Sequence, residues 1–120
     1  MNPGPSTSGT VGRDHEPDPL VHAGRVPTAG LTLVGIGHST LGVWQLLTRQ
    51  LTQLHQLRPE VATVTVELDD PGDQQLAEAT CDRHDLDVLP CFLLYEDGQL
   101  AAVQIGATNA ERLATFASRT

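Results

Sequence analysis

The pattern of apolar and polar residues after position 30 alternates between short strand-like runs and a longer helix-like segment. The run from Leu31 to Gly37 is apolar and closed by glycines, as expected of a strand buried on both faces of a parallel or mixed sheet. From Thr40 to Arg58, leucine and valine recur every three or four residues, which predicts an amphipathic helix that ends before Pro59. Residues 61–68 alternate apolar with polar side chains and predict a second strand. A right-handed crossover makes the two strands parallel, with the helix packed on one face of their sheet.

A turn and a short helix follow the second strand. Residues 69–73 are rich in Asp, Pro and Gly, which favour turns. The helix is expected from Gln74 to His84. Its spacing turns three side chains toward the core, namely Leu76, Ala79 and Thr80.

The last part of the chain predicts a hairpin and a final helix. After Pro90, residues 91–95 and 100–105 have the composition of two antiparallel strands, and the Asp-Gly pair between them favours a tight hairpin turn. Thr108 is expected to cap the final helix, with Glu111 completing a capping box. The predicted order is β-α-β-α-β-β-α, an α/β fold with a central mixed sheet flanked by helices.

Residues 1–29 differ in composition from the rest of the chain. They hold five of the eight prolines, and their apolar residues follow neither a helical nor a strand period. We therefore expect a disordered, Pro/Gly-rich arm over residues 1–29 and one folded domain over residues 30–120. A brief strand over residues 20–23 is the longest element that the nearby prolines allow.

Charge narrows the range of partners. Seven basic residues stand against 15 acidic ones in 120 residues, for a net charge of −8. Such a chain is repelled by nucleic-acid phosphates and by anionic membranes, so we expect neither as a partner. No apolar run approaches the roughly 18 residues of a membrane-spanning helix. The first residues lack the basic and apolar regions of a secretory signal, so a cytoplasmic location is expected.

The sequence contains no recognisable metal or cofactor motif. The spacing of its five histidines matches no known ligand set, and the acidic residues from 67 to 73 do not follow the EF-hand pattern. Two cysteines, Cys81 and Cys91, are too few for a disulfide framework. We therefore expect no metal and no cofactor.

The segment from Pro90 to Ala107 resembles the thioredoxin fold. In that family a strand begins at a cis-proline, passes through a charged turn with glycine into a second strand, and reaches Gly-Ala before the last helix. Pro90-Cys91-Phe92-Leu93-Leu94 opens this frame, and Gly106-Ala107 closes it without a gap. The resemblance covers roughly residues 31 to 117 and implies that the Leu89–Pro90 bond is cis.

The chain departs from the family where thioredoxins carry Trp-Cys-Gly-Pro-Cys. Here residues 37–42 read Gly-His-Ser-Thr-Leu-Gly, and no cysteine is among them. The buried carboxylate of the family's central strand is also missing from residues 33–36, and the single tryptophan, Trp44, falls inside the predicted helix. Serine and threonine hydroxyls form no mixed disulfides, so dithiol exchange at this position is chemically excluded.

The resemblance implies a binding groove at the proline. An extended peptide or protein segment would add beside the backbone of Leu89, along a groove formed by two stretches. The groove residues are Leu89, Pro90, Cys91, His38, Ser39 and Thr40. This gives the first hypothesis, a non-catalytic peptide-binding module of a redox-homeostasis or assembly pathway.

Two alternatives remain open from the sequence. One is an atypical thiol-disulfide oxidoreductase acting through Cys91, with Cys81 as the resolving thiol, which requires a solvent-reachable Cys91 with a pKa well below about 8.5. The other is an interaction or oligomerisation module that does not use the groove. The sequence does not identify the partner or the oligomeric state.

Overall fold

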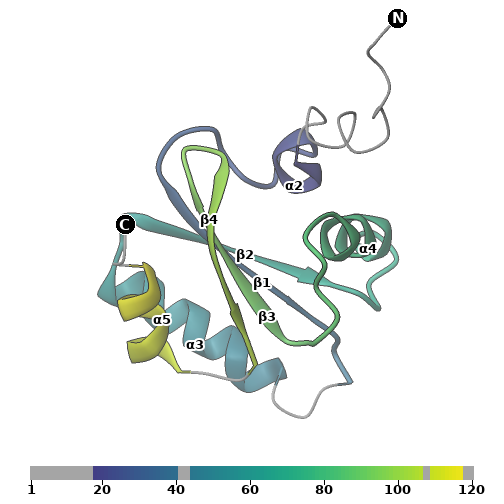
Figure 1. Cartoon of the computed structure of the whole chain (residues 1–120). Helices are drawn as coiled ribbons and strands as arrows, with labels where there is room; N and C mark the ends of the chain where they lie inside the picture. Colours follow the sequence, from purple (N-terminus) through teal and green to yellow (C-terminus); the bar gives the residue numbers. More distant parts are fainter. Residues whose placement is uncertain (1–17, 41–43, 107–108, 118–120) are drawn as a thin grey trace, which may run out of the picture.

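A four-stranded mixed sheet forms the centre of the computed structural model, which describes residues 18–40, 44–106 and 109–117 (Figure 1). The spatial order of its strands is β2 (Val61–Glu67), β1 (Leu31–Gly37), β3 (Cys91–Glu96) and β4 (Gln99–Ile105). β1 is parallel to β2 and antiparallel to β3, and β3 pairs with β4 as a hairpin. The central strand, the parallel crossover and the hairpin expected from the sequence are therefore confirmed.

Helices cover both faces of the sheet (Figure 1). The helices are α2 (Pro19–His22), α3 (Trp44–Leu57), α4 (Gln74–Arg83) and α5 (Ala110–Ala117). α3 and α5 pack on one face, where their leucines and phenylalanine meet side chains of β1 and β3. α2 and α4 pack on the other face in a second apolar cluster. No helix in the described part of the chain is long and apolar enough to span a bilayer.

Two glycines of β1 let α3 lie close to the sheet. A methyl group on Gly35 would lie 3.2 Å from Cδ1 of Leu51, and one on Gly37 would lie 2.3 Å from the ring of Trp44. The indole Nε1 of Trp44 donates to Oε2 of Glu67 on β2 at 2.8 Å, which fixes the ring over Gly37. The run of apolar residues and glycines in β1 thus matches one face of α3 in shape.

The inward face of α4 differs from the expected one. Ala77 and Thr80 are fully buried, whereas Leu76 is half-buried and Ala79 is exposed. Small residues suit this position because α4 packs closely against both α2 and the sheet. The hydroxyl of Thr80 donates to the carbonyl of Leu76 at 2.8 Å, so its burial leaves no unsatisfied donor.

The cap of α5 also differs from the expected one. The side chain of Asn109 accepts from the backbone N–H of Arg112 at 2.9 Å, which is the N-cap bond. Thr108, the predicted cap, lies outside the described residues. Threonine and asparagine are both good N-caps, so the adjacent residues 108 and 109 give the same sequence signal. The expected cap was therefore one residue too early.

The fold begins before residue 30, contrary to the expected boundary. Residues 19–22 form the helical turn α2 rather than a strand, and Leu20 and Val26 are almost completely buried. Arg25 fixes this segment, since its guanidinium donates to Oδ1 of Asp73 and to the carbonyl of Thr65, each at 2.8 Å. Residues 18–29 therefore belong to the domain, because long-range contacts order a stretch that lacks its own periodicity. Residues 1–17 of the predicted arm lie outside the described residues.

Candidate functional site

The two stretches of the predicted groove lie at the same end of the sheet. Ile36 is opposite Cys91 in the β1–β3 ladder, so Pro90 lies next to the segment that leaves β1. The Leu89–Pro90 peptide bond is cis, and the carbonyl of Pro90 accepts from the backbone N–H of Gly106 at 2.8 Å. The proline thus ties the start of β3 to the end of β4.

The loop after β1 is held by Asp69. Its Oδ1 accepts from the backbone N–H of Ser39 at 3.0 Å, and its Oδ2 accepts from the Ser39 hydroxyl. These hydrogen bonds hold the pKa of Asp69 below its ordinary value of 3.8. Nδ1 of His38 lies 2.6 Å from the hydroxyl of Thr40. The Ser39 hydroxyl donates to a carboxylate and not to the histidine, so Ser39 and His38 do not form a nucleophile and base pair.

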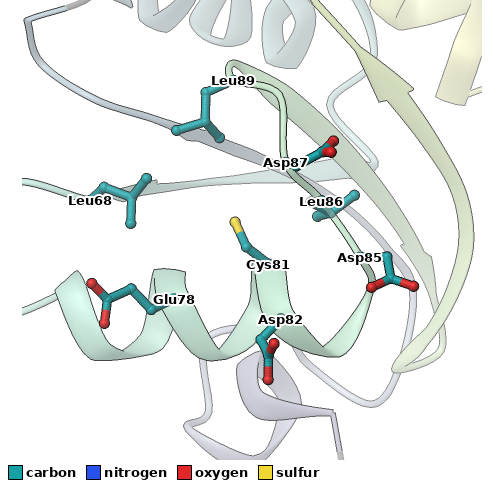
Figure 2. Close-up of a pocket in the computed structure, with 8 residues that line it drawn as sticks. All are labelled: Leu68, Glu78, Cys81, Asp82, Asp85, Leu86, Asp87 and Leu89. Carbon is teal, nitrogen blue, oxygen red and sulfur yellow. The ribbon is translucent and has the colours of Figure 1, made fainter.

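A pocket of about 590 Å³ opens beside Leu89, between α4 and the segment that leads to β3 (Figure 2). Its apolar lining consists of Leu68, Leu86 and Leu89, together with the thiol of Cys81. Its polar lining consists of four carboxylates, Glu78, Asp82, Asp85 and Asp87. The pocket therefore combines an apolar floor, formed by the three leucines and the thiol, with acidic residues along its border.

The end of α4 creates one wall of this pocket. Asp85 has a left-handed φ of 55°, and the backbone N–H of Leu86 donates to the carbonyl of Cys81 at 2.8 Å. A hydrogen bond from residue i+5 back to residue i, directly after a left-handed residue, is the Schellman motif that ends many helices. It reverses the direction of the chain sharply. Aspartate tolerates the left-handed conformation better than most residues. The reversal brings residues 85–89 back alongside α4.

A partly buried carboxylate, that of Asp18, fixes the same end of α4. Oδ2 of Asp18 accepts from the hydroxyl of Tyr95 at 2.8 Å and lies 2.7 Å from Nε2 of His84, the residue that caps α4. Burial alone raises the pKa of Asp18, but the hydrogen bonds from His84, Tyr95 and the Leu20 amide outweigh it and lower the pKa below 3.8. Burial, followed by the bond to Asp18, raises the pKa of Tyr95 above its ordinary value of 10. The network fastens the N-terminal segment to α4 and β3.

Replacing Asp18 with asparagine is expected to lower the free energy of unfolding by about 1 to 2 kcal/mol at neutral pH, because hydrogen bonds to a charged acceptor are lost. The folded pKa of Asp18 is depressed, so its carboxylate stabilises the fold above the unfolded pKa near 3.8. That contribution disappears as pH falls through the folded pKa.

Urea unfolding of wild type and Asp18→Asn, from neutral pH down to about pH 3, checks this expectation. The stability gap between the two proteins narrows below about pH 4, while Glu96→Gln, an exposed control, stays within about 0.5 kcal/mol of wild type at neutral pH. A stability difference between wild type and Asp18→Asn that does not change with pH would show that the ionised carboxylate of Asp18 is not the stabilising group.

Neither thiol lies in surroundings that favour its thiolate form. Cys91 is fully buried, and burial, followed by the nearby Cys81, raises the pKa of Cys91 to about 12. Cys81 is half-buried with its sulfur turned toward the pocket (Figure 2), and burial raises the pKa of this thiol above 9.0. Both cysteines are free, with no disulfide between them. The oxidoreductase hypothesis requires that Cys91 be reachable by solvent and have a low pKa. The structure contradicts both requirements.

Only one of the predicted groove residues lines the pocket. Leu89 does, whereas Pro90 and Cys91 are buried at its edge and residues 38–40 lie in the neighbouring loop. The other lining residues were not predicted. The sequence did contain a signal for them, since Glu78 and Asp82 are one helical turn apart and residues 85–89 mix acidic with apolar side chains.

No family model and no curated protein matches the chain. Solved structures match it in fold. The thioredoxin of Fasciola hepatica is 22% identical with a TM-score of 0.62, over 77% of this chain and 83% of that one. Mitochondrial thioredoxin 3 from Saccharomyces cerevisiae, in its oxidised form, is 23% identical with a TM-score of 0.63, over 77% of this chain and 80% of that one. Thioredoxin-2, described as a component of malaria parasite protein secretion machinery, is 11% identical with a TM-score of 0.64, over 76% of this chain and 84% of that one.

Proposed function

We propose that this chain, which has the thioredoxin fold without the dithiol motif, is a non-catalytic module that binds an extended peptide or protein segment. The binding site is the pocket between α4 and residues 85–89, next to the Leu89–Pro90 bond. The observation that carries the proposal is the pocket itself, with its three leucines and a thiol as an apolar floor. Its volume of about 590 Å³ suits an apolar side chain together with the backbone on either side.

The thiols support binding rather than catalysis. A thiol attacks a disulfide only as the thiolate, and the pKa values of both Cys81 and Cys91 are raised by burial. No cysteine stands in residues 37–42, where thioredoxins place their reactive pair. We therefore place the protein in a redox-homeostasis or assembly pathway as a component that recognises a partner and leaves its disulfides unchanged.

Selection from a random peptide library tests the proposal. The wild-type protein is expected to enrich peptides with a shared apolar position. Cys81→Phe, which fills the pocket with a ring, is expected to lose these peptides, while Cys81→Ala, its matched control, retains them because a methyl group keeps the floor apolar and the pocket open. Urea unfolding of both variants establishes that they are folded.

Two outcomes oppose the proposal. If no peptide is enriched by the folded wild-type protein, peptide binding at this site is excluded. If Cys81→Phe enriches the same peptides as wild type, the protein binds through another surface, as the interaction-module hypothesis expects.

A further inference from the structure

We infer that the segment bound in this pocket is cationic, with an apolar residue flanked by lysine or arginine; this inference rests on the proposed function. The pocket selects by charge as well as by shape. Half of its eight lining residues are carboxylates, and none is basic. Such a composition favours one class of peptide over its neutral or acidic counterparts.

The carboxylates belong to two elements that border the apolar floor. Glu78 and Asp82 are one turn apart on α4, and Asp85 and Asp87 lie on the segment that runs back beside it (Figure 2). All four residues are exposed, whereas Leu68, Leu86 and Leu89 are half-buried. A bound apolar side chain would therefore lie close to acidic residues that remain in contact with solvent.

Arg25, after α2, and Arg83, on α4, both lie outside the lining of the pocket. The guanidinium of Arg25 binds Asp73 and the carbonyl of Thr65. Arg83, the single basic residue of α4, does not line the pocket. Glu78 accepts a hydrogen bond from the neutral amide of Gln74 at 3.3 Å, which leaves its charge in place. The lining of the pocket thus contains four carboxylates and no basic side chain.

The spacing of the carboxylates favours a peptide over a metal ion. Across residues 18–40, 44–106 and 109–117, no three His, Cys, Asp or Glu side chains converge closely enough to hold one. The separated carboxylates beside the apolar floor instead suit an extended peptide whose basic side chains are separated along its backbone. The net charge of −8 adds long-range attraction for such a cation and speeds its association.

Fluorescence anisotropy with two synthetic peptides tests the inference. One carries a central Leu-Val-Leu flanked by arginines, and its twin has glutamates in place of the arginines. Wild type is expected to bind the arginine peptide at least about tenfold more tightly, since each exposed ion pair changes affinity by roughly two- to fivefold. Raising salt from about 50 mM to about 500 mM weakens this binding because the charges are screened.

Matched double variants separate local from general attraction. Glu78→Gln with Asp87→Asn removes two charges from the pocket, and Glu96→Gln with Glu111→Gln removes two charges outside its lining. We expect the first variant to lose about tenfold in affinity for the arginine peptide, and the second less than about twofold. Equal losses in both variants mean non-specific attraction by the net charge and overturn the inference.

The two experiments together separate charge selectivity from peptide binding itself. If library peptides enter the pocket but the arginine and glutamate peptides bind alike, the site exists and its charge selectivity is wrong. If neither the library nor the two peptides bind the folded protein, the site itself is wrong.

Discussion

Replacing Gly37 with alanine is expected to lower the free energy of unfolding by about 3 kcal/mol. The new methyl group would lie 2.3 Å from both Cε3 and Cζ3 of Trp44, well inside contact distance. The indole cannot simply move away, because the ring is buried and its Nε1 donates to Glu67 at 2.8 Å. Either α3 moves away from the sheet or this buried hydrogen bond breaks. Urea or thermal unfolding measures the loss.

Two further variants show whether the contact with Trp44 is responsible. Gly72→Ala is the matched control: its methyl group meets only Oδ1 of Asp70, at 3.4 Å, so stability is expected to stay within about 0.5 kcal/mol. In a Trp44→Leu background, which removes the ring, Gly37→Ala is expected to cost less than about 1 kcal/mol. An equal cost of Gly37→Ala in both backgrounds contradicts this explanation.

The native protein is expected to alkylate Cys91 at least about a hundredfold more slowly than the unfolded chain. Raising the pKa from 9.0 to about 12 lowers the thiolate fraction near pH 8 by roughly a thousandfold, and burial removes access as well. The rate should keep rising with pH well above pH 9, because the thiolate is the reactive form. Peptide mass mapping after timed exposure to iodoacetamide gives the rate at each cysteine.

The protein unfolded in urea is the control for this measurement, and both cysteines are expected to react there at similar rates. Fast reaction of native Cys91 with a midpoint below about pH 8.5, blocked by prior treatment with oxidised glutathione, contradicts the buried assignment. That result would restore the oxidoreductase hypothesis.

The sequence predicted the parts of the fold that local patterns determine. The apolar run of β1, the alternation in β2 and the Asp97–Gly98 turn each have a strong local signal, and both turn residues adopt positive φ values, 53° and 82°. The N-terminal segment has no such signal. Leu20 and Val26 are ordered by a tertiary cluster, and Asp18 by partners 66 and 77 residues away, so periodicity alone could not place them.

The candidate site was less predictable because it depends on a chain reversal. The sequence indicated Leu89 through its neighbour Pro90. Asp85 and Asp87 join the pocket only because Asp85 adopts a left-handed conformation, which turns residues 85–89 back along α4. Nothing in the local sequence requires that conformation of an aspartate. The raised pKa of Cys91 likewise follows from its burial in the apolar cluster on the α2 and α4 face of the sheet, which the spacing of two cysteines does not reveal.

Protection of Cys81 from alkylation tests peptide binding in this pocket directly, because the sulfur of Cys81 lies in the pocket (Figure 2). The native protein is treated with iodoacetamide with and without saturating arginine peptide, and modification of Cys81 is followed by mass mapping. We expect the peptide to slow modification of Cys81 at least about tenfold, and Glu78→Gln with Asp87→Asn to weaken this protection at equal peptide concentration. If Cys81 is modified at an unchanged rate when the peptide saturates the protein, the peptide occupies another surface and binding in this pocket is wrong.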